Sequence, residues 1–360
     1  MYSEYVIVGS GLTGGVIGRH LADAGRQVVV LDRRPRLGGN VADVCDPCGI
    51  NVHRYGPHLF RTVSDAIWQF LNRFTSFHDY KHQIKSRVDG ELENWPIAAS
   101  YIRRVCGDDW RPETDGVPQN FEEAALSLMP RVIYEKFVKG YTEKQWGVPA
   151  RSLSAGLCRR FDVRLDDNPY LTPKAKYQGI PAEGYSRMME RMLASIPLVL
   201  NFDYLKDREA FQARKLLIFS GPIDEYFNFE LGKLAYRGQQ RRHTYLADVD
   251  WQQPCGQVND PGEGPHIRDV EWKHIMHPEH AARIRGTLLT RETPWSPDSP
   301  EHYEYPFPAE ENRRLYEAYR KMAEGESGVL ICGRLGEYRY YDMDHAVGRA
   351  MTLARRILSG

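Results

Sequence analysis

The sequence predicts an α/β fold in which a Rossmann-like dinucleotide-binding domain is discontinuous, built from both ends of the chain. The first observation is a strand, glycine turn, helix and strand within the first 32 residues. The second is a strand, a glycine and a helix near the C-terminus, which must rejoin the same sheet. The third is a long middle region with helical and β-rich segments, which we therefore interpret as an insertion.

The N-terminal unit carries the residues typical of a dinucleotide site. An apolar strand, a helical pattern and a second strand occupy residues 4–31, with a Gly-x-Gly-x-x-Gly motif after the first strand. In this context Gly9 makes a tight turn, Gly11 lets the main chain approach a pyrophosphate, and Gly14 lets helix and strand pack closely. Asp32 is placed to accept a hydrogen bond from a ribose hydroxyl. The alternative, glycines that serve helix packing alone, is less favoured.

A second glycine pair favours the FAD type of this domain. Gly38 and Gly39, followed by Asn40, come after the second strand, as in flavoproteins. Near the C-terminus, residues 328–332 are expected to form a strand and residues 344–358 a helix. We expect the dinucleotide-binding domain to comprise residues 1–79 and 326–360.

The middle of the chain is expected to form two further parts. Residues 80–150 are interpreted as a helical lobe, and residues 64–77 and 121–138 as amphipathic helices. Residues 151–325 are expected to form an antiparallel β-sheet substrate domain with a mobile loop over residues 160–176. The β runs assigned to this sheet are residues 198–202, 216–219, 243–249, 266–271 and 286–291.

Composition limits the partners. Lysine plus arginine (48) equals aspartate plus glutamate (48), so no net charge attracts nucleic acid or an anionic membrane. No apolar run reaches the roughly 20 residues of a membrane-spanning helix, and no secretion signal is recognised. Six scattered cysteines indicate a reducing compartment, so we expect a cytoplasmic protein. A small molecule is the expected partner, with a homodimer as a candidate assembly.

Seven strings in the right order resemble the UDP-galactopyranose mutase family nearly end to end. They are Gly9 to Gly14, Gly38 to Asn40, His53 to Phe60, Gly140 to Gly147, Tyr177 to Pro181, Gly221 to Phe227 and Gly333 to Met343. The resemblance implies an isomerase that interconverts pyranose and furanose forms of a nucleotide-diphosphate hexose. It also implies reduced FAD as cofactor, whose N5 attacks the anomeric carbon and displaces the nucleoside diphosphate without net redox change.

The resemblance also implies site residues, matched position by position. As catalytic residues it implies Arg160 (on a mobile loop), Arg268, His58 and Glu292, and as cofactor-binding residues Arg334 and Met343 beside the glycine motifs. As further substrate-binding residues it implies Tyr141, Thr142, Trp146, Tyr170, Arg237, Tyr305, Tyr340 and Asp342. Two arginines suit a dianionic diphosphate, because guanidinium groups bind it bidentately. A core aromatic remains the alternative for Trp146, and a core histidine for His58.

The chain departs from the family pattern on the substrate side. Ala98 replaces a sugar-contacting asparagine, and Arg61 adds a charge near the expected flavin. The first hypothesis is therefore that the sugar nucleotide is not UDP-galactose, with GDP as a candidate nucleotide. The second is that His266 and Asp269 help to hold Mg²⁺ or Mn²⁺ at the diphosphate. Two solvated polar residues are favoured over this metal site, since residues three apart on a regular strand face opposite ways.

Two other functions stay open. A flavin-dependent oxidoreductase could use the same scaffold, although Trp146, Arg160 and Arg268 suit a diphosphate better than an amine. A flavin-independent, divalent-metal-assisted mutase or a sugar-nucleotide binder is the other alternative, which the departures at Arg61 and Ala98 support.

Overall fold

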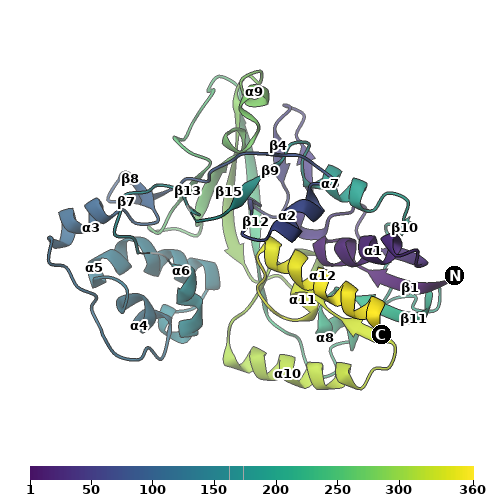
Figure 1. The fold of residues 1–360 in the computed structure, drawn as a ribbon. Coiled ribbons are helices and arrows are strands. Elements are labelled where there is room, and N and C mark those ends of the chain that lie inside the picture. Colours follow the sequence, from purple (N-terminus) through teal and green to yellow (C-terminus); the bar gives the residue numbers. More distant parts are fainter. Residues whose placement is uncertain (162, 173) are drawn as a thin grey trace.

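The computed structural model describes residues 1–161, 163–172 and 174–360, with the side chains of residues 159 and 160 outside the description. Three regions are visible in Figure 1. A parallel sheet lies on the side of both termini, a long, mostly antiparallel sheet rises through the centre, and short helices form a lobe on the opposite side.

The parallel sheet is formed by both ends of the chain, which confirms the discontinuous dinucleotide-binding fold. Its strand order is β10-β2-β1-β11-β17. The strands are β1 (Tyr2–Val8), β2 (Val28–Leu31), β10 (Leu198–Val199), β11 (Gln212–Phe219) and β17 (Val329–Ile331). Helix α1 (Leu12–Asp23) follows β1 and packs along α12 (Met343–Ser359), the C-terminal helix. The apolar side chains between these helices and the sheet form the largest buried cluster in the described chain.

Strands β10 and β11 correct one expectation. We expected residues 198–202 and 216–219 in the antiparallel sheet, but both segments pair in parallel within the dinucleotide sheet. The apolar end of β11, residues 217–219, is buried, as in strands covered on both faces. A short apolar run does not reveal its partner strand, and for that reason the sequence misled here. Helices α7 (Tyr185–Met192), α8 (Ile223–Tyr226) and α10 (Glu310–Glu324) accompany this sheet.

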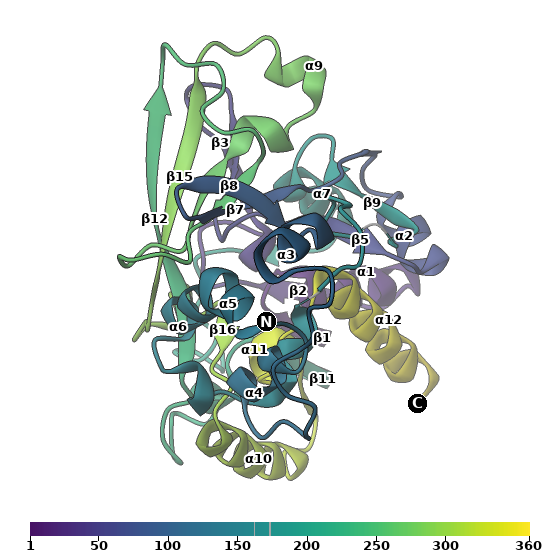
Figure 2. The ribbon, with the colours of Figure 1, turned by 90° about the vertical axis from the view of Figure 1, so that its left-hand side faces the viewer.

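The central sheet has seven strands in the order β16-β12-β15-β14-β13-β7-β8. They are β7 (Ile84–Val88), β8 (Glu91–Trp95), β12 (Tyr236–Leu246), β13 (Gln257–Asn259), β14 (Arg268–Glu271), β15 (Thr287–Trp295) and β16 (Tyr305–Pro306). The expected antiparallel pairing of the three later β runs is confirmed by β12, β14 and β15. Strands β7 and β8 join this sheet although their residues were expected in the helical lobe. Figure 2 shows β12 and β15 extending upward side by side.

The helical lobe is built from short helices instead of one long one. They are α3 (Ala99–Cys106), α4 (Phe121–Leu126), α5 (Arg131–Ile133), a π-helical turn (Tyr134–Lys139) and α6 (Gly140–Trp146). The expected helix over residues 121–138 is interrupted before Pro130, because proline disfavours helical geometry in the residue that precedes it. The expected helix over residues 64–77 is also shorter. It ends at Leu71 as α2 (Asp65–Leu71), and Phe77 lies in a strand paired with Pro181.

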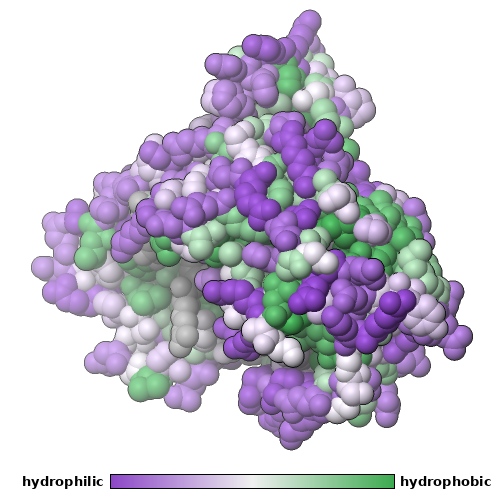
Figure 3. Space-filling view, turned by 45° about the vertical axis from the view of Figure 1, so that its right-hand side comes forward, coloured by the Kyte–Doolittle hydropathy of each residue, from purple (hydrophilic) through white to green (hydrophobic). Residues whose placement is uncertain are grey.

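Small elements complete the described chain. The strands are β3 (Asp43–Cys45), β4 (Asn51–His53), β5 (Phe60–Thr62), β6 (Phe77–His78) and β9 (Tyr177–Pro181), and the helices are α9 (Pro278–Ala281) and α11 (Gly333–Gly336). Single 3-10 turns cover Gly39–Val41, Ala150–Ser152, Ala155–Arg160, Trp272–Ile275 and Pro300–His302. Hydrophilic side chains cover the upper tip at α9 and the lower edge at α10 (Figure 3). No helix in the described chain has the length and apolar character needed to cross a membrane.

Candidate active site

One cavity of about 730 Å³ is lined by the parallel sheet, the central sheet and the helical lobe. Fifteen of the residues predicted for the site line it. They are Gly9, Gly11, Asp32, Gly39, Asn40, His58, Tyr141, Thr142, Trp146, Arg268, Arg334, Tyr305, Tyr340, Asp342 and Met343. The structure therefore brings together residues that are up to 334 positions apart in the sequence.

The glycines at one end of the cavity leave no room for side chains. Gly9 has a φ of +108°, and a Cβ there would lie 2.1 Å from Oγ of Ser220. A Cβ on Gly14 would lie 1.9 Å from the carbonyl oxygen of Gly9, so Gly14 serves helix–strand packing and does not line the cavity. A Cβ on Gly39 would lie 2.9 Å from Cα of Gly11. Bare main chain therefore faces the cavity, as a close-lying pyrophosphate requires.

Asp32 is held at this end by the main chain around it. Its Oδ2 accepts hydrogen bonds from N (2.8 Å) and Oγ (2.6 Å) of Ser10, and Oδ1 accepts one from N of Arg34 at 2.9 Å. Arg34 also donates to Oδ1 of Asn40 at 3.1 Å. The carboxylate has a fixed orientation and keeps acceptor capacity for a ribose hydroxyl.

Arg334 is the cavity-lining cation best suited to bind an anion. Its Nε and Nη2 are buried and have no hydrogen-bond partner among the described residues. The guanidinium lies 5.0 Å from the ring centroid of Tyr305 and 4.5 Å from that of Tyr340, and the two rings stack at 6.0 Å. Buried donors without partners are costly unless a ligand satisfies them. The glycine cradle and this guanidinium together fit the pyrophosphate of a dinucleotide or of a sugar nucleotide.

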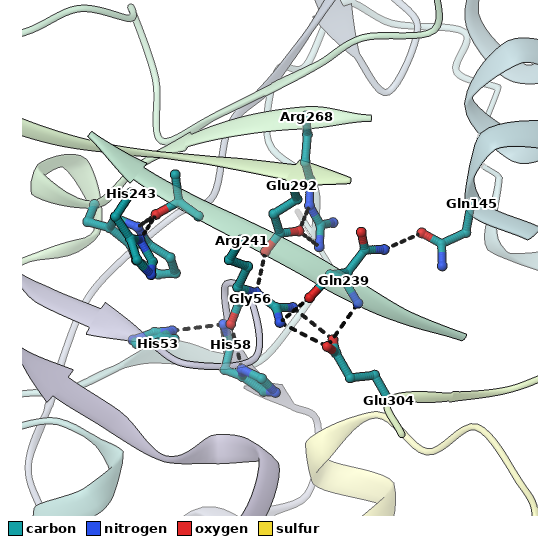
Figure 4. A network of polar contacts seen from close by, with 12 residues as sticks. His53, Gly56, His58, Gln145, Gln239, Arg241, His243, Arg268, Glu292 and Glu304 are labelled. Atoms are coloured by element: carbon teal, nitrogen blue, oxygen red, sulfur yellow. Dashed lines mark hydrogen bonds and ion pairs between the residues drawn. The ribbon is translucent and has the colours of Figure 1, made fainter. Parts of the chain in front are cut away.

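Two arginines and two glutamates form a buried cluster, and two of these residues, Arg268 and Glu304, line the cavity (Figure 4). The side chain of Glu292 is fully buried; its Oε1 accepts a bond from Nε of Arg241 at 2.9 Å. Its Oε2 lies 2.5 Å from both Nε and Nη2 of Arg268. Arg241 in turn donates from Nη1 and Nη2 to the two oxygens of Glu304, each at 2.8 Å.

The charges in this cluster stabilise one another. Burial alone would raise the pKa of Glu292, but the guanidinium groups of Arg268 and Arg241 outweigh burial and hold the pKa below its usual range. Burial alone would lower the pKa of Arg268, and the carboxylate of Glu292 raises it instead. Because Glu292 holds Arg268 by Nε and Nη2, Nη1 is the donor that this carboxylate does not engage. Glu292 itself lies behind Arg268 and does not line the cavity.

His58 faces the cavity as a neutral imidazole. Its Nδ1 lies 2.7 Å from the carbonyl oxygen of Gly56, so Nδ1 carries the proton and donates it to that bond. The main-chain N–H of His58 donates to Nδ1 of His53 at 2.9 Å. Burial, with His53 nearby, lowers the pKa of His58 to about 3. Nε2 is then the acceptor nitrogen of a ring whose orientation is set by its neighbours.

Helix α6 supplies the wall on the side of the helical lobe. Thr142 and Trp146 are four residues apart and lie on one face of the helix, and Tyr141 flanks them. Trp146 is 8% exposed and packs edge-to-face on Phe307 at 6.0 Å, so it belongs to the core of the lobe as well as to the cavity wall. Oγ1 of Thr142 is buried without a hydrogen-bond partner in the described chain, which leaves it available to a ligand.

Arg237 occupies a different place from the one the resemblance implied. Its Nε donates to the carbonyl oxygen of Gln145 at 2.8 Å, and its Nη2 to that of Lys144 at 3.1 Å. Its Nη1 donates to Oγ of Ser296 at 2.7 Å. The guanidinium thus caps the C-terminal end of α6 and does not line the cavity. Arg237 positions the helix that carries the aromatic wall.

Other predicted residues lie outside the cavity wall or outside the description. The side chain of Arg160 lies outside the described residues. Tyr170 does not line the cavity; it forms an isolated bridge with Gln83. Ala98 packs in the apolar core of the helical lobe, so its position does not support the argument for a lost sugar contact.

The two charges that depart from the family pattern have partners. Arg61 lines the cavity and donates to Oδ2 of Asp342 at 3.0 Å, so the added charge is paired with a predicted substrate residue. His266 lies 3.0 Å from Asp260, and Asp269 pairs with Arg291. In the described chain no group of three or more histidine, cysteine, aspartate or glutamate side chains is arranged to hold a metal ion.

Sequence reasoning missed several polar residues that line the cavity or lie behind its wall. Arg241 and Glu304 complete the charged cluster, and His82, Gln257 and Asn259 line the sheet face of the cavity. The signal for Arg241 was its spacing from Gln239, since residues two apart on a strand share a face.

Comparison with known proteins assigns the family. Residues 136–340 match the family described as UDP-galactopyranose mutase, and residues 7–74 match the NAD(P)-binding Rossmann-like domain. A probable UDP-galactopyranose mutase from Klebsiella pneumoniae is 32% identical over 98% of this chain and 94% of its own length. The dTDP-fucopyranose mutase of Escherichia coli is 30% identical over 98% of both chains.

A solved structure supports the fold over the same length. The crystal structure of a reduced UDP-galactopyranose mutase superposes with a TM-score of 0.77 at 15% identity and covers 99% of this chain and 96% of that one. The match to the family spans more than half of the chain, and the relatives span nearly all of it. The chain therefore belongs to the UDP-galactopyranose mutase family and is a mutase, an enzyme of the isomerase class.

Proposed function

We propose that this mutase interconverts the pyranose and furanose forms of a hexose linked to a nucleoside diphosphate, with reduced FAD as cofactor. One observation carries the proposal. A single cavity joins a glycine-lined dinucleotide end to a polar wall that contains Arg334 and Arg268. The names of the relatives, UDP-galactopyranose mutase and dTDP-fucopyranose mutase, support the reaction class and leave the nucleotide open.

The residues at the glycine end fit a flavin dinucleotide. Gly9, Gly11 and Gly39 leave space for its pyrophosphate, and Asp32 is oriented to accept a bond from its ribose. When bound and reduced, the flavin would supply the nucleophilic nitrogen that attacks the anomeric carbon. His58 places a neutral ring beside this region and adds no positive charge there.

The residues at the polar end fit the substrate. In the proposal Arg268 binds the diphosphate with the Nη1 edge that Glu292 leaves free, and stabilises it as a leaving group. Burial raises the pKa of Tyr305 to about 12, so its hydroxyl stays protonated and can donate a hydrogen bond to a phosphate oxygen. Trp146 and Tyr141 offer aromatic surface to the nucleoside. The pairing of Arg61 with Asp342 keeps that carboxylate from repelling the phosphates.

The decisive experiment is a turnover assay across nucleotide sugars. The purified protein is incubated with UDP-, GDP- and dTDP-hexoses, with and without dithionite, and the furanose product is separated chromatographically. We expect conversion with at least one nucleotide, only after reduction, by a protein whose visible spectrum shows flavin. Net consumption of oxygen or NAD(P)H per turnover would contradict the proposal and favour an oxidoreductase.

The same assay tests the remaining parts of the proposal. A divalent cation at the diphosphate, Mg²⁺ or Mn²⁺, is kept as a secondary hypothesis, and full activity after chelator treatment would refute it. Turnover without flavin but with added metal would favour the flavin-independent alternative.

We also propose a cytoplasmic enzyme, which the six free cysteines of the described chain support, and a homodimer, which sedimentation analysis tests.

A further inference from the structure

A row of polar side chains lies under the sheet face of the cavity, apart from the arginine–glutamate cluster. We call Tyr80, His82, Gln257 and Asn259 the amide relay. Tyr80 and His82 precede β7, and Gln257 and Asn259 lie on β13, which pairs with β7 (Figure 1). His82, Gln257 and Asn259 are 4%, 4% and 6% exposed and all three line the cavity.

Two hydrogen bonds define the relay. Oη of Tyr80 lies 3.1 Å from Nδ1 of His82, and Nε2 of Gln257 donates to Oδ1 of Asn259 at 2.8 Å. Burial lowers the pKa of His82 to about 3, so the ring is neutral and carries one proton. If the tyrosine O–H donates to Nδ1, the proton of the neutral His82 ring is on Nε2. Gln257 donates to Asn259, whose oxygen is the acceptor of that bond.

The end of the relay determines what the cavity wall offers. The oxygen of Asn259 is occupied by Gln257, so the Nδ2 amide hydrogens of Asn259 are the ones left for a ligand. Asn259 lies directly opposite Arg268 in the pairing of β13 with β14. This wall therefore presents hydrogen-bond donors beside a guanidinium group.

We propose that Gln257 is a specificity-determining positioning residue, which fixes Asn259 so that its N–H group binds a hydroxyl oxygen of the hexose. The inference rests on the proposed function, since it takes the ligand to be a nucleotide hexose. A sugar without an oxygen at that place leaves a buried donor unpaired, and the enzyme therefore discriminates against that sugar by about 10- to 100-fold. Gln257 acts through Asn259 and does not itself need to touch the sugar.

A double-mutant cycle separates positioning from a general structural role. The variants are Gln257→Met, Asn259→Ala and their combination, with Gln240→Met as control, because Gln240 is an exposed glutamine on β12. We expect each single change in the relay to lower kcat/KM for the accepted nucleotide hexose by about 10- to 100-fold, mainly through KM. Inhibition by the free nucleoside diphosphate, which lacks the hexose, should stay within about twofold of wild type.

Non-additivity is the decisive readout. In the Asn259→Ala background, adding Gln257→Met should lower kcat/KM by less than about threefold, because the residue through which Gln257 acts is already gone. Among monodeoxy analogues of the hexose, one should be strongly disfavoured by the wild type and no longer disfavoured by Asn259→Ala. Losses that multiply in the double variant, or equal weakening of nucleoside diphosphate binding, would overturn the proposal.

A second variant guards against a folding defect. Gln257→Glu keeps the shape of the side chain, but a carboxylate cannot donate to Asn259, whose N–H would turn inward. We expect a loss of kcat/KM similar to that of Gln257→Met, at an unfolding midpoint near that of wild type. Wild-type activity in Gln257→Glu would overturn the relay while leaving the proposed function intact. A wild-type protein that converts no nucleotide hexose would overturn both.

Discussion

Oε2 of Glu292 lies 2.5 Å from Nε of Arg268, and this contact sets the direction of the guanidinium that faces the cavity. Neither charge is stable there alone, because Glu292 is fully buried and most of Arg268 is enclosed. The pair is completed by Arg241 and Glu304, so the cluster carries no net charge before a ligand arrives. A diphosphate therefore meets an arginine that is already oriented.

Neutralising Glu292 should damage both stability and turnover. In Glu292→Gln the two arginines lose their shared carboxylate, and breaking a buried pair costs roughly 3–5 kcal/mol of unfolding free energy. We expect an earlier urea midpoint and a fall in kcat/KM of at least about tenfold. The control is Asp269→Asn, which breaks the more exposed pair with Arg291 and should cost only about 0–1 kcal/mol. Equal midpoints for the two variants would contradict the argument.

Arg334 should govern the binding of an anion at the glycine end of the cavity. Its buried Nε and Nη2 lack hydrogen-bond partners in the described chain, so Arg334→Gln breaks no hydrogen bond of these two atoms and removes only the contacts of the guanidinium with the rings of Tyr305 and Tyr340. We expect loss of flavin during purification, or a dissociation constant raised about 10-fold or more, with little change in the melting temperature. Absorbance at the flavin band measures this. Arg339→Gln, an exposed arginine five residues on, should retain flavin fully.

The contact between Gly14 and Gly9 should not tolerate a methyl group. In Gly14→Ala the new Cβ would lie 1.9 Å from the carbonyl oxygen of Gly9, so α1 must move away from β1. Overpacking of this kind costs about 1–3 kcal/mol, and the displaced main chain should also lose flavin. Gly116→Ala is the matched control, because a Cβ there meets no atom within 4 Å. Retention of flavin by Gly14→Ala would show that the helix can shift freely.

Stability should fall as the pH drops below neutrality. Burial lowers the pKa of His53 to about 4 and the pKa values of His58 and His82 to about 3. Below a pH of about 6.5 the unfolded chain binds protons that the folded protein excludes, so folding loses roughly 1–2 kcal/mol per buried histidine by pH 5. Urea unfolding at pH 7.5 and pH 5 measures this loss. His82→Asn should reduce the difference between the two pH values, whereas His280→Asn, at an exposed position, should not.

Local geometry explains which parts of the fold were predictable. The packing at Gly14 depends on Gly9 and Ile7, only a few residues earlier, so the sequence indicates it directly. The partner of β11 is β1, more than 200 residues earlier in the chain, and nothing in an apolar run identifies such a partner. The end of the helix near Leu126 could have been predicted, because Pro130 is a local signal. The pairing of Phe77 with Pro181 could not, because the partner lies far along the chain.

The candidate site likewise has residues that the sequence could predict and residues that it could not. Residues within recognisable strings, such as Arg334 and Tyr340, line the cavity as expected. Arg237 also lies in a recognisable string, yet its guanidinium is occupied by carbonyl groups 92 and 93 residues away. Arg241 and Glu304 are 63 residues apart. Their pairing requires β12 to lie beside the segment that leads into β16, which neither residue type indicates. Which charge is paired and which is free is thus a property of the folded chain.

The cap that Arg237 places on α6 has a consequence for engineering. Two hydrogen bonds join the end of this helix to Arg237 on β12, and a third joins Arg237 to Ser296, so the aromatic wall is fixed to the sheet. A graft that exchanges the helical lobe for that of a relative, to change the nucleotide accepted, would therefore have to carry Arg237 and Ser296 with it. Exchanging α6 alone would transfer the aromatic wall without the Arg237 contacts that fix its position.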